Sequence, residues 1–389
     1  MVFRRLCLST AALTLALCAL PPAAASTAPR TGPAGPTLQR DADALRDTGV
    51  TGVSVRLDAP GGAVTAVSGV QDLVGRGPVV DGGHLRLGST TKTFVATVVL
   101  QLVGEKRLSL DRTVEELLPG TVSGAGNDGR TITVRDLLRH TSGLHDYIGD
   151  VFPDPGVRTY YAERWRAYRP EQLVALAMRH EPDFPAGTRW AYSNTNYVLA
   201  GMIVEAVTGR SWEQQVHDRI LRPLGMRHTD TPGTSPHLPY PHTANYQQFA
   251  PDGPMTDTTI PYRPFDSGAD GSMTGTARDL NRFYGALASG RLLRPAERAA
   301  MRTTVPVPPG AGHPEGTRDG LGLFLTPLSC GGEYLGHGGS GFGYVVRAAA
   351  TADGRRTVTV SAHSRSADPV VAARQEDALR TLVDNALCR

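Results

Sequence analysis

Strand-like patterns stand at both ends of the chain, and helix-like patterns fill its middle. Segments in which apolar residues alternate with small or polar ones occur in two pairs: 50–57, 63–70, 342–350 and 356–363. Turns containing glycine, at 60–62 and 353–354, separate the members of each pair. Each pair is therefore predicted to form a β-hairpin. A final helix is expected at 367–387.

Apolar residues recur at helical spacing between these ends. One long apolar helix is expected from Ser89 to Gly104, and a buried helix is expected at 195–208. Thr133 and Thr276 each stand three residues before an acid, which is typical of helix starts. The pattern predicts an α/β (α+β) protein with one antiparallel sheet built from both chain ends and flanked by helices. The predicted sheet domain comprises 39–105 and 285–389, and a mostly helical domain is inserted at 106–284.

The first 25 residues have the pattern of an export signal. Arg4 and Arg5 precede an apolar run at 6–20, and Ala23-Ala24-Ala25 offers a cleavage site. The apolar run is too short to span a bilayer permanently. We therefore expect a secreted protein without a permanent membrane anchor. Residues 26–38, rich in proline, glycine and threonine, are predicted to be a flexible leader.

Composition excludes several classes of protein. Loss of the signal leaves 38 basic and 37 acidic residues, so the charge does not favour binding to nucleic acid. Cys330 and Cys388 are then the only cysteines, and they form either one disulfide or two free thiols. No glycine-rich nucleotide motif opens a helix, so no cofactor is expected. No metal is predicted, because these histidines have no ligand spacing: His140, His145, His217, His228 and His242.

The first chemical motif is Ser89-Thr90-Thr91-Lys92, at the start of the long apolar helix. Positions three residues apart share a helix face, so Lys92 lies within reach of the Ser89 hydroxyl. Serine is a weak nucleophile unless a neighbouring base takes its proton, and a partly desolvated lysine can be that base. The alternative is an ordinary helix cap beside a surface lysine.

The second motif is Tyr192-Ser193-Asn194, just before the helix expected at 195–208. A tyrosine hydroxyl can relay a proton if a nearby ammonium group holds down its pKa. An asparagine side chain can both donate to and accept from a substrate amide. The alternative is a polar loop that caps the next helix.

The third motif is His337-Gly338-Gly339-Ser340, which precedes the strand expected at 342–350. Its glycines leave an edge along which a substrate backbone could pair. One of its backbone N–H groups could join that of Ser89 as an oxyanion hole, and His337 could place a proton-dependent charge near the site. The alternative is a glycine-rich turn.

The order and spacing of the three motifs resemble the set shared by serine β-lactamases and penicillin-binding proteins. The Tyr-x-Asn form is similar to the class C branch, and the chain looks most like secreted actinobacterial, Streptomyces-type D-alanyl-D-alanine carboxypeptidases. Stretches such as LGSTTKTF at 87–94 and HGGSGFGY at 337–344 carry this resemblance. It covers nearly the whole chain after the signal and implies a β-lactamase/transpeptidase-like fold.

The resemblance also implies roles for individual residues. Ser89 would be acylated, while Lys92 and Tyr192 would share base and acid duties. Asn194 would orient the substrate amide, and His337 would replace the lysine or histidine of the family. Gly339 and Ser340 would bind substrate, with the Ser340 N–H in the oxyanion hole. The cysteine pair also matches the carboxypeptidase pattern.

Two departures from that pattern concern the substrate. Gly338 stands where the peptidases usually carry a threonine that helps to hold the terminal carboxylate, and residues 323–328 lack an expected arginine. The leading hypothesis is a monomeric D-alanyl-D-alanine carboxypeptidase that is acylated by penicillins and needs no cofactor. The alternatives are a β-lactamase, an esterase or another D-amino-acid peptidase of the same fold, or a non-catalytic penicillin- or peptidoglycan-binding protein.

Overall fold

The computed structural model describes residues 35–154, 156–233, 235–263 and 268–389. The predicted signal peptide and residues 26–34 of the predicted leader lie outside this range. Helix α1 (Gly35–Arg46) begins inside the predicted leader, four residues before the predicted sheet domain starts at residue 39. Leu38, Ala42 and Leu45 share one face of α1 and are buried there, and this packing explains why the end of the leader is helical.

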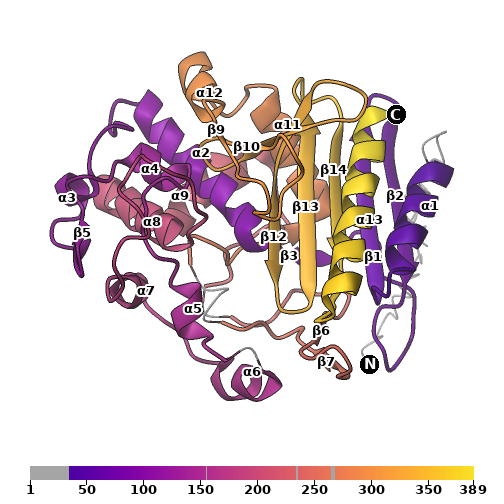
Figure 1. Ribbon diagram of the computed structural model, residues 1–389. Coiled ribbons are helices and arrows are strands. Elements are labelled where there is room, and N and C mark those ends of the chain that lie inside the picture. The colour runs from indigo at the N-terminus through magenta and orange to yellow at the C-terminus, as the bar shows by residue number, and fades with distance from the viewer. Residues whose placement is uncertain (1–34, 155, 234, 264–267) are drawn as a thin grey trace, which may run out of the picture.

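An eight-stranded antiparallel sheet forms the centre of the molecule, in the order β2-β1-β14-β13-β12-β11-β10-β9 (Figure 1). Its strands are β1 (Gly52–Ala59), β2 (Gly62–Gly69), β9 (Val305–Pro306), β10 (Arg318–Asp319), β11 (Phe324–Pro327), β12 (Glu333–Gly341), β13 (Tyr344–Thr351) and β14 (Thr357–Ala362). Both predicted hairpins are present, and β1 pairs directly with β14, with Val55 opposite Val360. The two chain ends therefore build one sheet, as the pattern predicted.

Helices cover both faces of this sheet. Helix α1 and the C-terminal helix α13 (Pro369–Cys388) pack side by side on one face (Figure 1). On the other face lies α11 (Ala277–Ala288), which contacts β1, β13 and β14. A second core continues from this face into the helical region, where α2 (Thr91–Gly104) packs against α8 (Thr195–Thr208). The central helix that carries the first motif is thus held by apolar contacts along its whole length.

Short helices and strands complete the described part of the chain. The helices are α3 (Val114–Leu117), α4 (Val134–Leu138), α5 (Ile148–Val151), α6 (Val157–Glu163), α7 (Pro170–Ala177), α9 (Trp212–Val216), α10 (Arg222–Leu224) and α12 (Pro295–Met301). The strands are β3 (His84–Arg86), β4 (Ser123–Gly124), β5 (Asn127–Asp128), β6 (Tyr246–Gln248), β7 (Met255–Asp257), β8 (Thr274–Thr276) and β15 (Ser364–Arg365). Thr133 and Thr276 cap their helices as predicted, by accepting hydrogen bonds from the N–H groups three residues on. None of the described helices has the length and apolar character needed to cross a bilayer.

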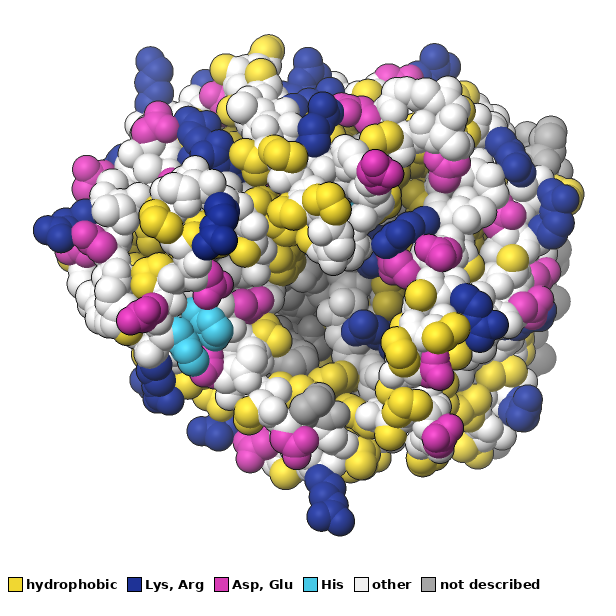
Figure 2. Space-filling view, in the orientation of Figure 1, with side chains coloured by type: hydrophobic (Ala, Val, Ile, Leu, Met, Phe, Trp, Pro, Cys, Tyr) yellow, Lys and Arg dark blue, Asp and Glu magenta, His cyan; other side chains and the backbone are white. Residues whose placement is uncertain are grey.

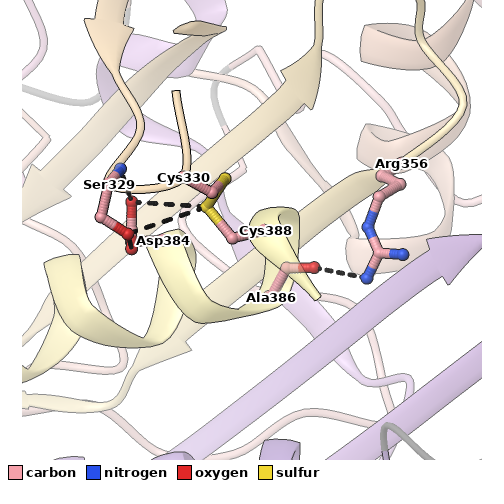
Figure 3. Close-up of a disulfide and its surroundings, with 6 residues drawn as sticks. All are labelled: Ser329, Cys330, Arg356, Asp384, Ala386 and Cys388. Atoms are coloured by element: carbon pink, nitrogen blue, oxygen red, sulfur yellow. Dashed lines mark hydrogen bonds between the residues drawn. A yellow bond between two sulfur atoms is a disulfide. The ribbon is translucent and has the colours of Figure 1, made fainter. Parts of the chain in front are cut away.

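A disulfide between Cys330 and Cys388 ties the end of α13 to the turn before β12, which confirms the predicted pairing (Figure 3). Neighbouring hydrogen bonds hold the same junction. The Ser329 N–H donates to Asp384 Oδ1 over 2.9 Å, and Arg356 Nη2 donates to the Ala386 carbonyl over 2.9 Å. The last turn of α13 is therefore fixed to the sheet covalently and by polar contacts.

Removing this disulfide should destabilise the fold without touching the reactive groups. The bond closes a loop between residues 58 apart, for which chain entropy assigns about 4 kcal/mol. We expect Cys330→Ala/Cys388→Ala to lower the free energy of unfolding by that amount in urea titrations followed by circular dichroism. Asp384→Asn, which keeps the disulfide, is the control and should lose less. Equal losses in the two variants would contradict the prediction.

Candidate active site

The nucleophile candidate Ser89 lies on a short 3₁₀ turn, η1 (Gly88–Thr90), that leads directly into α2. Gly88 has a φ of +48°, which favours glycine. A Cβ at this position would also lie only 2.9 Å from the Ser340 backbone nitrogen on β12. Gly88 therefore allows the turn that carries Ser89 to approach the third motif closely.

Lys92 is fully buried and donates hydrogen bonds to three oxygen atoms. Its Nζ lies 3.0 Å from Ser89 Oγ, 2.7 Å from Asn194 Oδ1 and 2.6 Å from the Asp270 carbonyl oxygen. An ammonium group has three donors, and these acceptors match them. The structure thus brings the first and second motifs together, with the lysine between Ser89 and Asn194.

The Tyr192 side chain lies against the same lysine. Lys92 Nζ is 5.0 Å from the centre of the Tyr192 ring. The Tyr192 hydroxyl is buried beside Ser89, without a hydrogen bond of ordinary geometry to a described group. Burial raises the pKa of Tyr192 well above its usual value, while the Ser89 side chain acts in the lowering direction. We expected an ammonium group to hold this pKa down, but desolvation dominates, so the tyrosine is a neutral phenol at pH 7 and can donate a proton.

His140 holds the loop that carries the second motif. Its Nδ1 accepts a hydrogen bond from the Ser193 N–H over 3.1 Å, and its carbonyl accepts one from the Ala191 N–H over 3.0 Å. Its ring also stacks on Tyr192, with the ring centres 4.2 Å apart. Burial lowers the pKa of His140 well below its usual value, so the ring is neutral and Nδ1 can accept. His140 therefore orders the loop of the second motif.

Asn194 is held at both ends of its amide. Oδ1 accepts from Lys92, and Nδ2 donates to Asp146 Oδ2 over 2.9 Å. Asp146, Tyr147 and Asp270 lie outside the three sequence motifs. In the structure Tyr147 Oη donates to Asp270 Oδ2 over 2.7 Å, so these residues form a second layer around the lysine. No motif marks them, because they meet only through contacts between distant segments.

The third motif lies within β12, whereas the strand expected at 342–350 is the next one, β13. Strand β11 pairs with β12 as far as Gly336, and no described strand continues that pairing along residues 337–340. At Gly339 a Cβ would lie 1.9 Å from the Leu87 carbonyl oxygen. The bare glycine edge therefore packs directly against the segment that carries Ser89, as a shared oxyanion hole requires.

The two adjacent glycines of this motif should differ in their tolerance of a methyl group. In Gly339→Ala the new Cβ meets the Leu87 carbonyl, so β12 must move away from Ser89. In Gly338→Ala it meets only the flexible Arg347 guanidinium group, with Nη1 at 2.5 Å. We expect Gly339→Ala to lose about 1–3 kcal/mol of stability and most of the kcat, because overpacking costs that much. Gly338→Ala, the matched control, should keep both; equal losses would refute this geometry.

His337 is buried on β12, and its Nδ1 lies 2.5 Å from the Gly338 carbonyl oxygen. Burial, assisted by the charge of Lys92, lowers the pKa of His337 to about 3. The ring is therefore neutral at pH 7 and acts there as a fixed polar group. The expectation of a proton-dependent charge near the site thus applies only at acidic pH.

This shift predicts a specific dependence of stability on pH. Between about pH 6.5 and 3, His337 is protonated in the unfolded chain but neutral in the folded protein. The free energy of unfolding should therefore fall as the pH falls through this window, by up to about 1.4 kcal/mol per pH unit. His337→Gln should make the slope shallower. A residual slope should remain in that variant, because burial also lowers the pKa of His140, and lowers those of His313 and His363 to about 4. An unchanged slope would contradict the prediction.

A cavity of about 360 Å³ opens beside these groups, and Figure 2 shows that this face of the molecule is hollowed. Ser89, Tyr192, Trp190 and residues 336–340 line it. Arg347 on β13 also lines the cavity, opposite Gly338 in the strand register. Its Nη2 contacts both carboxylate oxygens of Glu376 at 3.0 and 2.9 Å. The guanidinium group of Arg347, which lies beside Gly338, is therefore already paired with the Glu376 carboxylate.

Comparison with known proteins identifies the family. The family model described as Beta-lactamase matches residues 38–382, which is nearly all of the described chain. This chain belongs to the beta-lactamase family. Its fold is accordingly the beta-lactamase fold, as the three motifs implied, and the protein is a serine hydrolase of this family. The side chains that the motifs predict for this chemistry lie together: Ser89 Oγ is 3.0 Å from Lys92 Nζ, which is 5.0 Å from the centre of the Tyr192 ring.

Several members of the beta-lactamase family are similar to this one. A D-stereospecific amidohydrolase from Streptomyces sp. is 39% identical, with a TM-score of 0.80, over 88% of this chain and 98% of that one. A D-amino acid amidase from Ochrobactrum anthropi SV3, complexed with L-phenylalanine amide, is 26% identical, with a TM-score of 0.75, over 89% and 98%. Penicillin-binding protein 4 of Amycolatopsis lactamdurans is 35% identical over 37% of this chain. That match covers 35% of the length of penicillin-binding protein 4. Three further curated relatives are matched over 27–56% of their own lengths, so this chain spans only part of each of them.

One structural neighbour, at 24% identity and a TM-score of 0.72, is described as the octameric penicillin-binding protein homologue from Pyrococcus abyssi. The expectation that this hydrolase is a monomer therefore stays a prediction.

Proposed function

We propose that this protein hydrolyses amides of D-amino acids, acting as a D-stereospecific amidohydrolase or D-aminopeptidase. The observation that carries the proposal is the pairing of Arg347 with Glu376 beside Gly338. A carboxypeptidase must hold a free carboxylate at this end of the site. Here the threonine hydroxyl of the peptidases is absent, and the neighbouring guanidinium group is neutralised by an acid. The structural similarity to the Streptomyces amidohydrolase supports the same substrate class.

The geometry supports acyl transfer through Ser89. When Lys92 is neutral, its lone pair replaces one N–H and can accept the Ser89 proton over the 3.0 Å contact while Oγ attacks the amide carbonyl. The N–H groups of Ser89 and Ser340 then stabilise the oxyanion. Tyr192, a neutral phenol, donates a proton to the leaving amine, and water hydrolyses the acyl-enzyme afterwards. We also infer that residues 1–25 direct export of the protein. The signal pattern of these residues and the Cys330–Cys388 disulfide support this inference.

A direct comparison of substrates tests the proposal. We expect D-phenylalanine amide to be hydrolysed with a kcat/KM more than about tenfold that of its L-enantiomer, equivalent to about 1.4 kcal/mol of transition-state binding. The kcat/KM for D-phenylalanine amide should also exceed, by a similar factor, the kcat/KM for a blocked peptide ending in D-alanyl-D-alanine. Release of ammonia and of D-alanine gives the two rates. Preference for the blocked peptide would restore the carboxypeptidase hypothesis, and cleavage of short acyl esters alone would favour an esterase.

A charge variant separates the two substrate classes further. Glu376→Gln removes the acid that neutralises Arg347, so kcat/KM for the peptide with a free carboxylate should rise relative to the amide. Glu333→Gln is the matched control, because it breaks an arginine pair with Arg318 that does not line the cavity. An unchanged ratio of the two substrates in Glu376→Gln would remove this pair from substrate selection.

A further inference from the structure

A cluster of two histidines and an aspartate lies beside α5, apart from the three motifs of the active site. His145, Asp150 and His180 place one ligand-type atom each within 4.8 Å of the others. Asp150 lies in α5, and His180 follows α7, 30 residues further along the chain. This spacing matches no local ligand motif, so the sequence analysis predicted no metal at His145.

The contacts within the cluster converge on one carboxylate group. His180 Nε2 lies 2.8 Å from Asp150 Oδ1, and His145 Nε2 lies 3.7 Å from Asp150 Oδ2. Asp150 Oδ2 is buried and has no hydrogen-bond partner among the described residues. The two imidazole rings stack with their centres 3.9 Å apart. One nitrogen of each imidazole and a carboxylate oxygen therefore lie within 4.8 Å of one another.

A second carboxylate stands behind one of the rings. The other nitrogen of His145, Nδ1, lies 3.7 Å from Asp183 Oδ1. In metal sites, a histidine ligand commonly presents its second ring nitrogen to a carboxylate, which sets its tautomer and orientation. Asp183 is in the position for this role. The cluster thus has both a set of ligands and an outer group that would orient one of them.

We infer that His145, Asp150 and His180 bind a divalent transition-metal ion of the zinc type. Two imidazoles and a carboxylate form the donor set of three-ligand zinc sites, in which water completes the coordination. The side chains of His145 and His180 are 30% and 41% exposed, so an ion can enter from solvent. Figure 2 shows histidine side chains bordered by acidic ones on the open face of the molecule. The inference goes beyond the proposed function and does not depend on it.

The bound ion would brace the loop that carries the second motif. The His145 carbonyl accepts a hydrogen bond from Thr195 Oγ1 over 2.7 Å, and the next residue, Asp146, accepts one from Asn194. Coordination would link this segment to His180, which comes from a separate part of the chain. Binding to the folded state alone also raises its stability by mass action. The ion should therefore raise the midpoint of thermal unfolding, by an amount that grows with the logarithm of its concentration once the site is saturated.

Calorimetric titration of untagged, EDTA-treated full-length protein with ZnCl₂ tests the site. We expect one ion per chain. His180→Ala and Asp150→Asn should each weaken binding by more than about tenfold, and Asp183→Asn by about 10- to 100-fold, the range for groups that orient ligands. His217→Ala is the matched control, because His217 also lies beside an aspartate, 3.1 Å from Asp218 Oδ1, but has no third ligand within the part of the chain that the structure describes. Its affinity should stay within twofold of the unaltered protein.

Cobalt provides a readout that needs no variant. Addition of CoCl₂ to the unaltered protein should give the strong visible absorption of four- or five-coordinate Co²⁺, and equimolar ZnCl₂ should abolish it. Absence of saturable Zn²⁺ binding up to the order of 1 mM would overturn the inference. An equal loss of affinity in His217→Ala and His180→Ala would do the same. Circular dichroism spectra establish that each variant compared is folded.

Discussion

A Ser89→Ala variant is expected to form no covalent adduct with penicillin and to lose turnover of D-amino-acid amides. Ser89 Oγ is the hydroxyl that Lys92 contacts at 3.0 Å, at a turn where the Ser340 N–H lies close by. Alanine keeps the turn but removes the atom that forms the acyl bond. We expect kcat to fall roughly 10⁴- to 10⁶-fold, the range seen when another serine hydrolase loses a member of its catalytic triad.

Intact mass spectrometry after incubation with penicillin measures the first effect directly, and release of the adduct over time measures deacylation. Ser123→Ala is the control, because Ser123 is an exposed serine on β4 away from the site. An adduct that persists in Ser89→Ala would place the nucleophile elsewhere. A stable protein that neither forms an adduct nor turns over any substrate in its unaltered form would instead support the non-catalytic binder.

Replacement of Lys92 by methionine should slow acylation by about 10²- to 10⁴-fold, the usual contribution of a positioned acid or base. Methionine has nearly the length of lysine but carries no proton-transfer group. The substitution also leaves the Asn194 Oδ1 and Asp270 carbonyl oxygens without their donor, at about 1–3 kcal/mol for each buried acceptor left unsatisfied. We therefore expect a lower melting temperature together with the lower rate.

The chain offers a matched control, because Lys106 is its only other lysine and is exposed. Lys106→Met should change neither the acylation rate nor the melting temperature. Single-turnover acylation, measured well below the melting temperature of each variant, separates loss of chemistry from loss of folded protein. A Lys92→Met variant that is acylated at the unaltered rate would remove this residue from proton transfer.

Much of the fold follows from local patterns. The period-two segments, their glycine turns and the apolar helix after Ser89 appear within a few residues of their predicted limits. Two departures have a common cause. The start of α1 at Gly35 and the strand β12 through the third motif both depend on what packs against them. Leu38 is buried on α1, and the glycines of β12 pair with β13 although they have no side chains to mark a strand.

The class of chemistry could also be predicted from short segments of the sequence, because it depends on the identity of a few residues. Ser89 and Lys92 are three positions apart, so helix geometry alone brings them together. The sequence does not show whether burial or a neighbouring charge has the larger effect on the pKa of a side chain. Desolvation raises the pKa of Tyr192 and lowers that of His337, and both shifts depend on segments distant in the chain.

The sequence by itself therefore determined the order of strands and helices, the three motifs and the acyl-transfer chemistry that their side chains allow. Only the tertiary structure decided which distant groups meet. It brought Asn194 and Asp270 into contact with Lys92, from 102 and 178 positions away along the chain. It also paired Glu376 with Arg347 beside Gly338. It also gathered two histidines and an aspartate that share no motif. Local pattern reports which face of an element is apolar, whereas such contacts arise from the packing of whole elements against one another.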